Sequence, residues 1–81
     1  PAEIEVTTEG LKVHSVPGND APVIGVVLQG SKHKVLEGDE WQWMQIEVSR
    51  WDETQYHVTN QNRGWVYGKP GLVRVVSRRW W

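Results

Sequence analysis

The sequence predicts a single small all-β domain, built as a barrel of five to six short strands. Its 81 residues suffice for one hydrophobic core. Eight glycines and four prolines are spread along the chain, with short apolar runs between them, which is the spacing of strands separated by turns. No helical periodicity and no internal repeat interrupts this pattern. Because cysteine is absent, the core must hold the fold without disulfides or thiolate metal sites.

The first third of the chain alternates apolar and polar residues and then breaks into a turn-rich segment. Residues 3–6 predict a short amino-terminal strand or arm, and residues 11–14 predict a strand with Leu11 and Val13 facing inward. Residues 15–22 contain two prolines, a glycine, an asparagine and an aspartate, a composition typical of turns. We therefore expect a long, ordered loop there.

Further strands are predicted on both sides of the chain centre. Residues 23–28 form a β-branched run, and residues 32–36 form a strand that ends at the polar hairpin loop 37–40. Residues 64–67 and 72–76 flank a turn that contains glycine and proline, and they complete the barrel.

The strand that begins at Trp41 has the clearest alternation in the chain. Met44, Ile46 and Val48 share one face, and Trp41 and Trp43 share the other. The aliphatic face is the better core face, so both indoles are predicted to point outward together.

The segment that follows this strand is mostly polar. Its strongly apolar members are Trp51, Tyr56 and Val58, and residues 52–55 have the composition of a turn. We predict an extended hairpin insertion at about 49–62.

Charge and aromatic content restrict the possible partners. A net charge of −1 lacks the broad basic field of a protein that binds duplex nucleic acid. No stretch approaches the roughly 20 apolar residues that span a bilayer. Six tryptophans exceed what so small a core encloses, because each ring buries about 150–250 Å². Some indoles are therefore expected on the surface, where they often mark recognition sites.

Several segments, taken in order, resemble the bacterial SH3 family. The opening stretch is similar to the family pattern L-x-V-R-S-x-P-G, and the later segments match its strands, turns and closing Gly-Trp-Val. The residues that carry the resemblance are Leu11-Lys12-Val13-His14-Ser15-Val16-Pro17-Gly18, Val23-Ile24-Gly25, Leu28, Gly30, Val35-Leu36, Trp41, Met44, Ile46 and Gly64-Trp65-Val66.

The resemblance implies a half-open SH3-like barrel over residues 11–76. Residues 1–10 precede it as an amino-terminal strand or arm, and residues 77–81 follow it as a basic and aromatic tail. Two features depart from the family. His14 stands where an arginine is usual, and the insertion at 49–62 replaces a short turn.

The resemblance also implies a function. Domains of this family commonly accompany cell-wall hydrolases in envelope or extracellular proteins, where they recognise peptidoglycan, often its peptide part. We therefore expect a non-catalytic targeting module that uses no cofactor, with an adjoining hydrolase domain as a candidate partner. The alternative is a protein–protein interaction or assembly domain, in which exposed indoles and the insertion bury against another domain or subunit.

The candidate groove lies between the long first loop and the loop before Trp41, as the resemblance implies. Aromatic rings would contact an extended peptide or a sugar face there, and the polar loop would supply hydrogen bonds. In the alternative interpretation the outward indoles only cover one end of the barrel, and Trp65 is expected to be a packing residue. The candidate ligand-binding residues are His14, Asn19, Asp20, Trp41, Trp43, Tyr67 and Pro70.

Catalytic and metal sites are not expected. His14, His33 and His57 lie far apart without the spacing of metal ligands, and we interpret them as solvent-facing histidines of strands or loops. The carboxylates are scattered or lie in turns, and no pair occupies an apolar setting that would raise a pKa.

The carboxyl-terminal tail and the start of the sequence each fit more than one interpretation. The tail Arg78-Arg79-Trp80-Trp81 fits contact with an anionic membrane surface, a last strand of the barrel or the start of a linker. We expect neither membrane binding nor nucleic-acid binding from so short a basic segment. The sequence opens at Pro1 without a methionine, and we expect a mature fragment or an excised domain of a longer chain.

Overall fold

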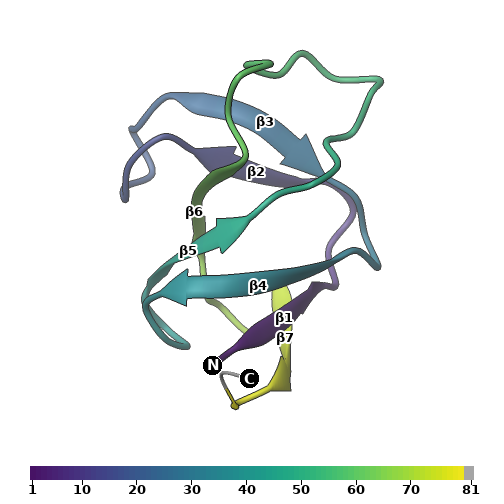
Figure 1. Cartoon of the computed structure of the whole chain (residues 1–81). Helices are drawn as coiled ribbons and strands as arrows, with labels where there is room; N and C mark the ends of the chain where they lie inside the picture. Colours follow the sequence, from purple (N-terminus) through teal and green to yellow (C-terminus); the bar gives the residue numbers. More distant parts are fainter. Residues whose placement is uncertain (80–81) are drawn as a thin grey trace.

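Seven β-strands make up the regular structure of the described residues, 1–79 (Figure 1). The computed structural model describes residues 1–79, and this part contains no helix, hence none long and apolar enough to cross a membrane. The strands are β1 (Glu3–Val6), β2 (Leu11–His14), β3 (Val23–Val27), β4 (Lys32–Glu37), β5 (Trp43–Glu47), β6 (Arg63–Tyr67) and β7 (Val73–Ser77).

All seven strands belong to one antiparallel sheet in the order β3-β2-β6-β5-β4-β1-β7. The sheet curls around one core, and its two end strands, β3 and β7, do not pair with each other in the described part of the chain. The prediction of a small all-β, barrel-like domain is confirmed. Within residues 1–79 the strand count is seven rather than five to six, because β1 is a full member of the sheet.

β1 lies inside the sheet, between β4 and β7. Its alternation places Ile4 and Val6 in the core and leaves Glu3 and Glu5 partly exposed. Of the two alternatives predicted for residues 3–6, a strand or an arm, the structure has the strand. At the other end, the predicted tail overlaps the sheet, because β7 continues to Ser77.

The core gathers the inward side chains of every strand. Met44 and Ile46 are fully buried, as the predicted inner face of that strand requires, and so is Val13. Burying these apolar surfaces is the main stabilising contribution in a domain without disulfides. The buried cluster consists of Ile4, Val6, Leu11, Val13, Ile24, Val27, Val35, Met44, Ile46, Val48, Trp51, Val66 and Val73.

The segment between β5 and β6 differs in form from the predicted hairpin extension. β5 and β6 do pair as an antiparallel hairpin, but residues 48–62 add no strand to it. They form a loop that lies beside β3 in Figure 1. The backbone N–H groups of Asp52 and Val58 donate to carbonyl oxygens of β3 over 2.8 Å each, so the loop covers the free edge of that strand.

Candidate ligand-binding site

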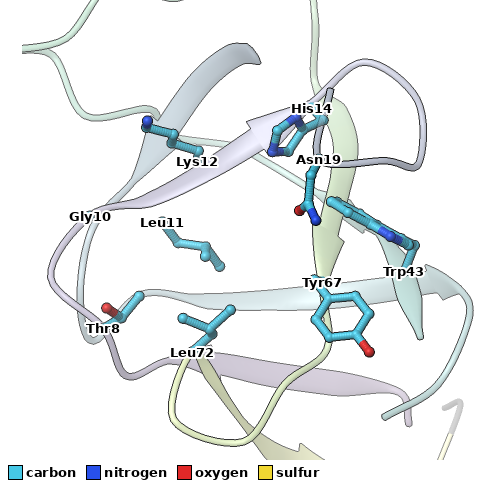
Figure 2. A pocket seen from close by; sticks show the side chains of 9 residues that line it. All are labelled: Thr8, Gly10, Leu11, Lys12, His14, Asn19, Trp43, Tyr67 and Leu72. Carbon is cyan, nitrogen blue, oxygen red and sulfur yellow. The ribbon is translucent and has the colours of Figure 1, made fainter. Parts of the chain in front are cut away.

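An open pocket of about 250 Å³ is lined by residues of β2, β5 and β6 and of the loops that flank β2 and precede β7 (Figure 2). Its walls combine apolar surface with several polar side chains, which is the usual make-up of a ligand site. The lining residues are Thr8, Gly10, Leu11, Lys12, His14, Asn19, Trp43, Tyr67 and Leu72.

Three aromatic side chains form one wall of this pocket. The rings of His14 and Trp43 meet edge to face, with centroids 5.3 Å apart and planes at 87°. Trp43 and Tyr67 lie opposite each other on β5 and β6, and their centroids are 5.6 Å apart at 62°. Edge-to-face contacts of this kind are favourable beyond simple burial, because the positive edge of one ring meets the negative face of the next. The three rings therefore support one another.

His14 also fixes the long loop beside the pocket. Its Nδ1 lies 2.9 Å from the carbonyl oxygen of Ala21, and a carbonyl only accepts, so Nδ1 carries the proton. In the neutral ring Nε2 is then left as a hydrogen-bond acceptor. The backbone N–H of Ser15 donates to the carbonyl of Pro22 over 2.9 Å, which closes the same loop.

The loop brings Asn19 to the pocket. Figure 2 shows its side chain pointing from the loop toward Trp43 and Tyr67. The amide offers both a donor and an acceptor, and Lys12 is the one charged side chain among the lining residues. The pocket thus combines flat apolar rings with groups able to bond a polar ligand.

Four of the seven sequence-predicted site residues line this pocket together, namely His14, Asn19, Trp43 and Tyr67.

The other three candidate residues lie outside the pocket lining. Asp20 is exposed in the loop after β2, and Pro70 lies in the turn before β7, where it bridges to Val73. Trp41 precedes β5 instead of belonging to it, so the prediction that both indoles project from one strand face is wrong. Its backbone takes a left-handed turn conformation with φ of 62°, and its side chain is 61% exposed.

Sequence reasoning missed five lining residues: Thr8, Gly10, Leu11, Lys12 and Leu72.

Of these five residues, Lys12 could have been predicted from the alternation of its strand. It lies two residues before His14 on the same strand, and period-two alternation puts both on one face. Thr8 and Leu72 come from loops, and no local pattern places them. Trp65 is half-buried on the outer face of β6, opposite His14 of β2 and Gln45 of β5.

The histidines differ from the solvent-facing interpretation. His33 is buried, and its Nδ1 lies 2.9 Å from the carbonyl of Glu47 while its Nε2 lies 2.8 Å from the Ser31 hydroxyl. Burial lowers the pKa of His33, although the bond to the Glu47 carbonyl opposes this shift. His57 is half-buried and stacks on Trp51.

Among residues 77–79 of the predicted tail, none lines this pocket. Within residues 1–79 no three His, Asp or Glu side chains come close enough together to hold a metal ion. Arg78 pairs with Glu40 over 2.7 Å at the surface. Trp80 and Trp81 lie outside the described residues.

Comparison of the chain with models of protein families, with curated proteins and with solved structures finds no match.

Proposed function

We propose that this domain is a non-catalytic binding module that recognises bacterial cell-wall peptidoglycan through its stem peptide. The observation that supports this function best is the aromatic pocket formed by His14, Trp43 and Tyr67, with open hydrogen-bonding groups at its rim. The resemblance of the sequence to bacterial SH3 domains, which commonly recognise peptidoglycan, supports the choice of ligand.

The polar groups of the pocket suit an extended peptide. The His14 ring offers Nε2, the nitrogen that is not bonded to Ala21, and the Asn19 amide offers a donor and an acceptor. A peptide backbone presents the complementary N–H and C=O groups at regular intervals. The edge-to-face rings add a rigid apolar surface for a short side chain, and rigid rings lose little conformational entropy on binding.

The pocket lacks the parts of a hydrolytic centre. Its lining contains no carboxylate and no cysteine, and the hydroxyl of Thr8 has no general base paired with it in the described structure. We therefore propose targeting rather than catalysis, and a hydrolase domain in a longer parent chain remains the proposed partner. The proposed location is the cell envelope or the extracellular space.

Co-sedimentation with purified peptidoglycan tests this function. We expect the wild-type chain to sediment with the walls and Trp43→Ala, shown to be folded by circular dichroism, to remain in the supernatant. Tyr56→Ala is the matched control, because Tyr56 is an exposed aromatic residue outside the pocket lining. Absence of wild-type sedimentation would reject the ligand class, and sedimentation of the Trp43 variant would reject the site.

An assembly domain is the second candidate function, and the exposed side chains of the insertion favour it. Tyr56 is 85% exposed, and Leu28, 48% exposed, shares a shallow surface hollow with Asp52 and Gln55 of the insertion. Such apolar groups would be buried by another subunit. Sedimentation velocity over a range of concentrations separates the two functions, because only an assembly domain associates as concentration rises.

A further inference from the structure

Trp41 holds a backbone conformation that its side chain makes costly. Its φ of 62° lies in the left-handed region, and within residues 1–79 every other residue with positive φ is a glycine. Bulky residues rarely adopt this conformation, because Cβ crowds the neighbouring carbonyl oxygen. Glycine would adopt it freely. The indole is therefore present at a place where the fold itself favours glycine.

Backbone hydrogen bonds impose this conformation. The N–H of Trp41 donates to the carbonyl of Gly68 over 2.7 Å, and the hydroxyl of Tyr67 donates to the carbonyl of Trp41 over 3.1 Å. The N–H of Gly68 returns a bond to the carbonyl of Gln42 over 2.8 Å. The first two bonds use only the main chain of Trp41, so any residue except proline could make them at this position.

The indole itself contributes little to the described fold. It is 61% exposed, and none of the ring contacts within residues 1–79 involves it. Its backbone is nevertheless bonded to Tyr67, whose ring lines the aromatic pocket. A strained and exposed aromatic residue that adjoins a pocket is better explained by binding than by packing.

The residues beside Trp41 indicate which class of ligand its indole binds. Asp39 and Glu40 precede the indole and Gln42 follows it, and each has an oxygen that can accept a hydroxyl hydrogen. The backbone N–H of Glu40 lowers the pKa of Asp39, so this carboxylate is ionised at neutral pH. Glu40 pairs with Arg78 over 2.7 Å, and Asp39 lies 3.7 Å from the N-terminal ammonium group, so the charges beside the indole are balanced. A balanced setting suits a neutral ligand better than phosphate or anionic lipid. A neutral sugar ring, with apolar C–H groups on its face and hydroxyls at its edge, fits an indole in this setting.

We propose that Trp41 is a second subsite, which stacks on a sugar ring of the same ligand whose peptide occupies the aromatic pocket. This inference rests on the proposed function, and it specifies a glycopeptide rather than a peptide alone as the ligand. The pocket and Trp41 are joined through Tyr67, so one ligand with a saccharide attached to a peptide can contact both.

Isothermal titration with two defined probes tests the subsite. The probes are the disaccharide-pentapeptide released from peptidoglycan and the same pentapeptide without sugar. We expect the wild type to bind the disaccharide-pentapeptide at least about tenfold more tightly, as loss of a well-placed aromatic contact typically costs. Trp41→Gly should bind both probes with the affinity of the pentapeptide alone, and Trp41→Phe should keep part of the preference.

Thermal melting provides the control that separates binding from folding. Because glycine relaxes the left-handed backbone, the melting temperature of Trp41→Gly should be no lower than that of the wild type. A lower melting temperature, or equal wild-type affinity for the two probes, overturns the subsite while leaving the proposed function intact. Failure of the wild type to bind either probe overturns the proposed function, and the subsite with it.

Discussion

The indole of Trp51 occupies the space beside Gly25 of β3 where any other residue would carry its side chain. A Cβ on Gly25 would lie 2.7 Å from Cζ3 of Trp51, closer than real carbon atoms approach. The indole N–H donates to the carbonyl of Gln61 over 3.2 Å, and His57 stacks on the ring with centroids 5.9 Å apart. The Trp51 side chain thus anchors the insertion to the core, together with the backbone hydrogen bonds from Asp52 and Val58 to β3.

Gly25→Ala should therefore destabilise the domain. The added methyl group overlaps the Trp51 ring, and overpacking of a tight core costs about 1–3 kcal/mol of unfolding free energy. Urea denaturation of the variant measures this loss. In a Trp51→Ala background, Gly25→Ala should lower the unfolding free energy much less, because the ring that the added methyl group overlaps is absent. Equal costs in both backgrounds would show that the indole does not fill this space.

Trp51 and Tyr56 should contribute very differently to stability, although both are aromatic residues of the insertion. Trp51 is 7% exposed and Tyr56 is 85% exposed. Trp51→Ala should lower the unfolding free energy by about 3–5 kcal/mol, because it removes a large buried ring. Tyr56→Ala should change it by no more than about 0.5 kcal/mol, as is usual for exposed sites. Thermal melting of the two variants side by side checks the contrast, and similar melting temperatures would contradict it.

Local alternation predicts most of the fold, because each strand alternates apolar and polar residues within its own sequence. Leu11, Val13, Met44 and Ile46 all face the core as their parity requires. His33 had the same signal, since it shares a face with buried Val35, but its polar side chain was interpreted as solvent-facing.

The features that sequence reasoning missed depend on contacts between distant segments. Trp41 leaves its expected strand because Gly68 and Tyr67, far along the chain, bond its backbone into a turn. The insertion forms a loop rather than a hairpin extension because Trp51 finds open space at Gly25, which no local pattern reveals. The missed part of the pocket lining has the same origin, since Thr8 and Leu72 reach the pocket from separate loops.

The buried imidazole of His33 should make stability depend on pH. Burial holds its folded-state pKa below the ordinary value of about 6.5, so the folded protein favours the neutral ring. Between the folded and unfolded pKa values the unfolded chain binds more protons, and stability therefore rises with pH across that window. We expect this contribution to be complete well above pH 6.5 and to fall away as the solution is acidified.

Urea denaturation at several pH values measures this contribution when the wild type is compared with His33→Asn. The amide N–H of the introduced asparagine can still donate to the Glu47 carbonyl. The difference between the two proteins isolates His33 from other titrating groups. The wild type should lose more stability than the variant between about pH 7.5 and pH 5. Parallel pH profiles would show that His33 is not kept neutral by the fold.

His14 should control the order of the loop beside the pocket as well as the aromatic wall. His14→Phe keeps a ring against Trp43 but removes the Nδ1–H that bonds the Ala21 carbonyl. The loss of this half-buried hydrogen bond should cost about 0.5–1.5 kcal/mol of unfolding free energy. The loop should also open more often, since the bond from Ser15 to Pro22 then closes it with less support.

Amide hydrogen exchange measures the opening of this loop directly and needs no ligand. The N–H of Ser15, bonded to Pro22 over 2.9 Å, and that of Ala21, bonded to Gly18 over 3.2 Å, should exchange faster in His14→Phe than in the wild type. Amides of β4 and β5 provide the internal reference, because they lie outside the loop. Unchanged exchange at Ser15 and Ala21 would mean that the loop is ordered by its own turns, and that His14 acts in the pocket only through its ring. Faster exchange confined to the loop would instead establish that one imidazole both orders the segment carrying Asn19 and supports Trp43, so that a single substitution disturbs both sides of the pocket.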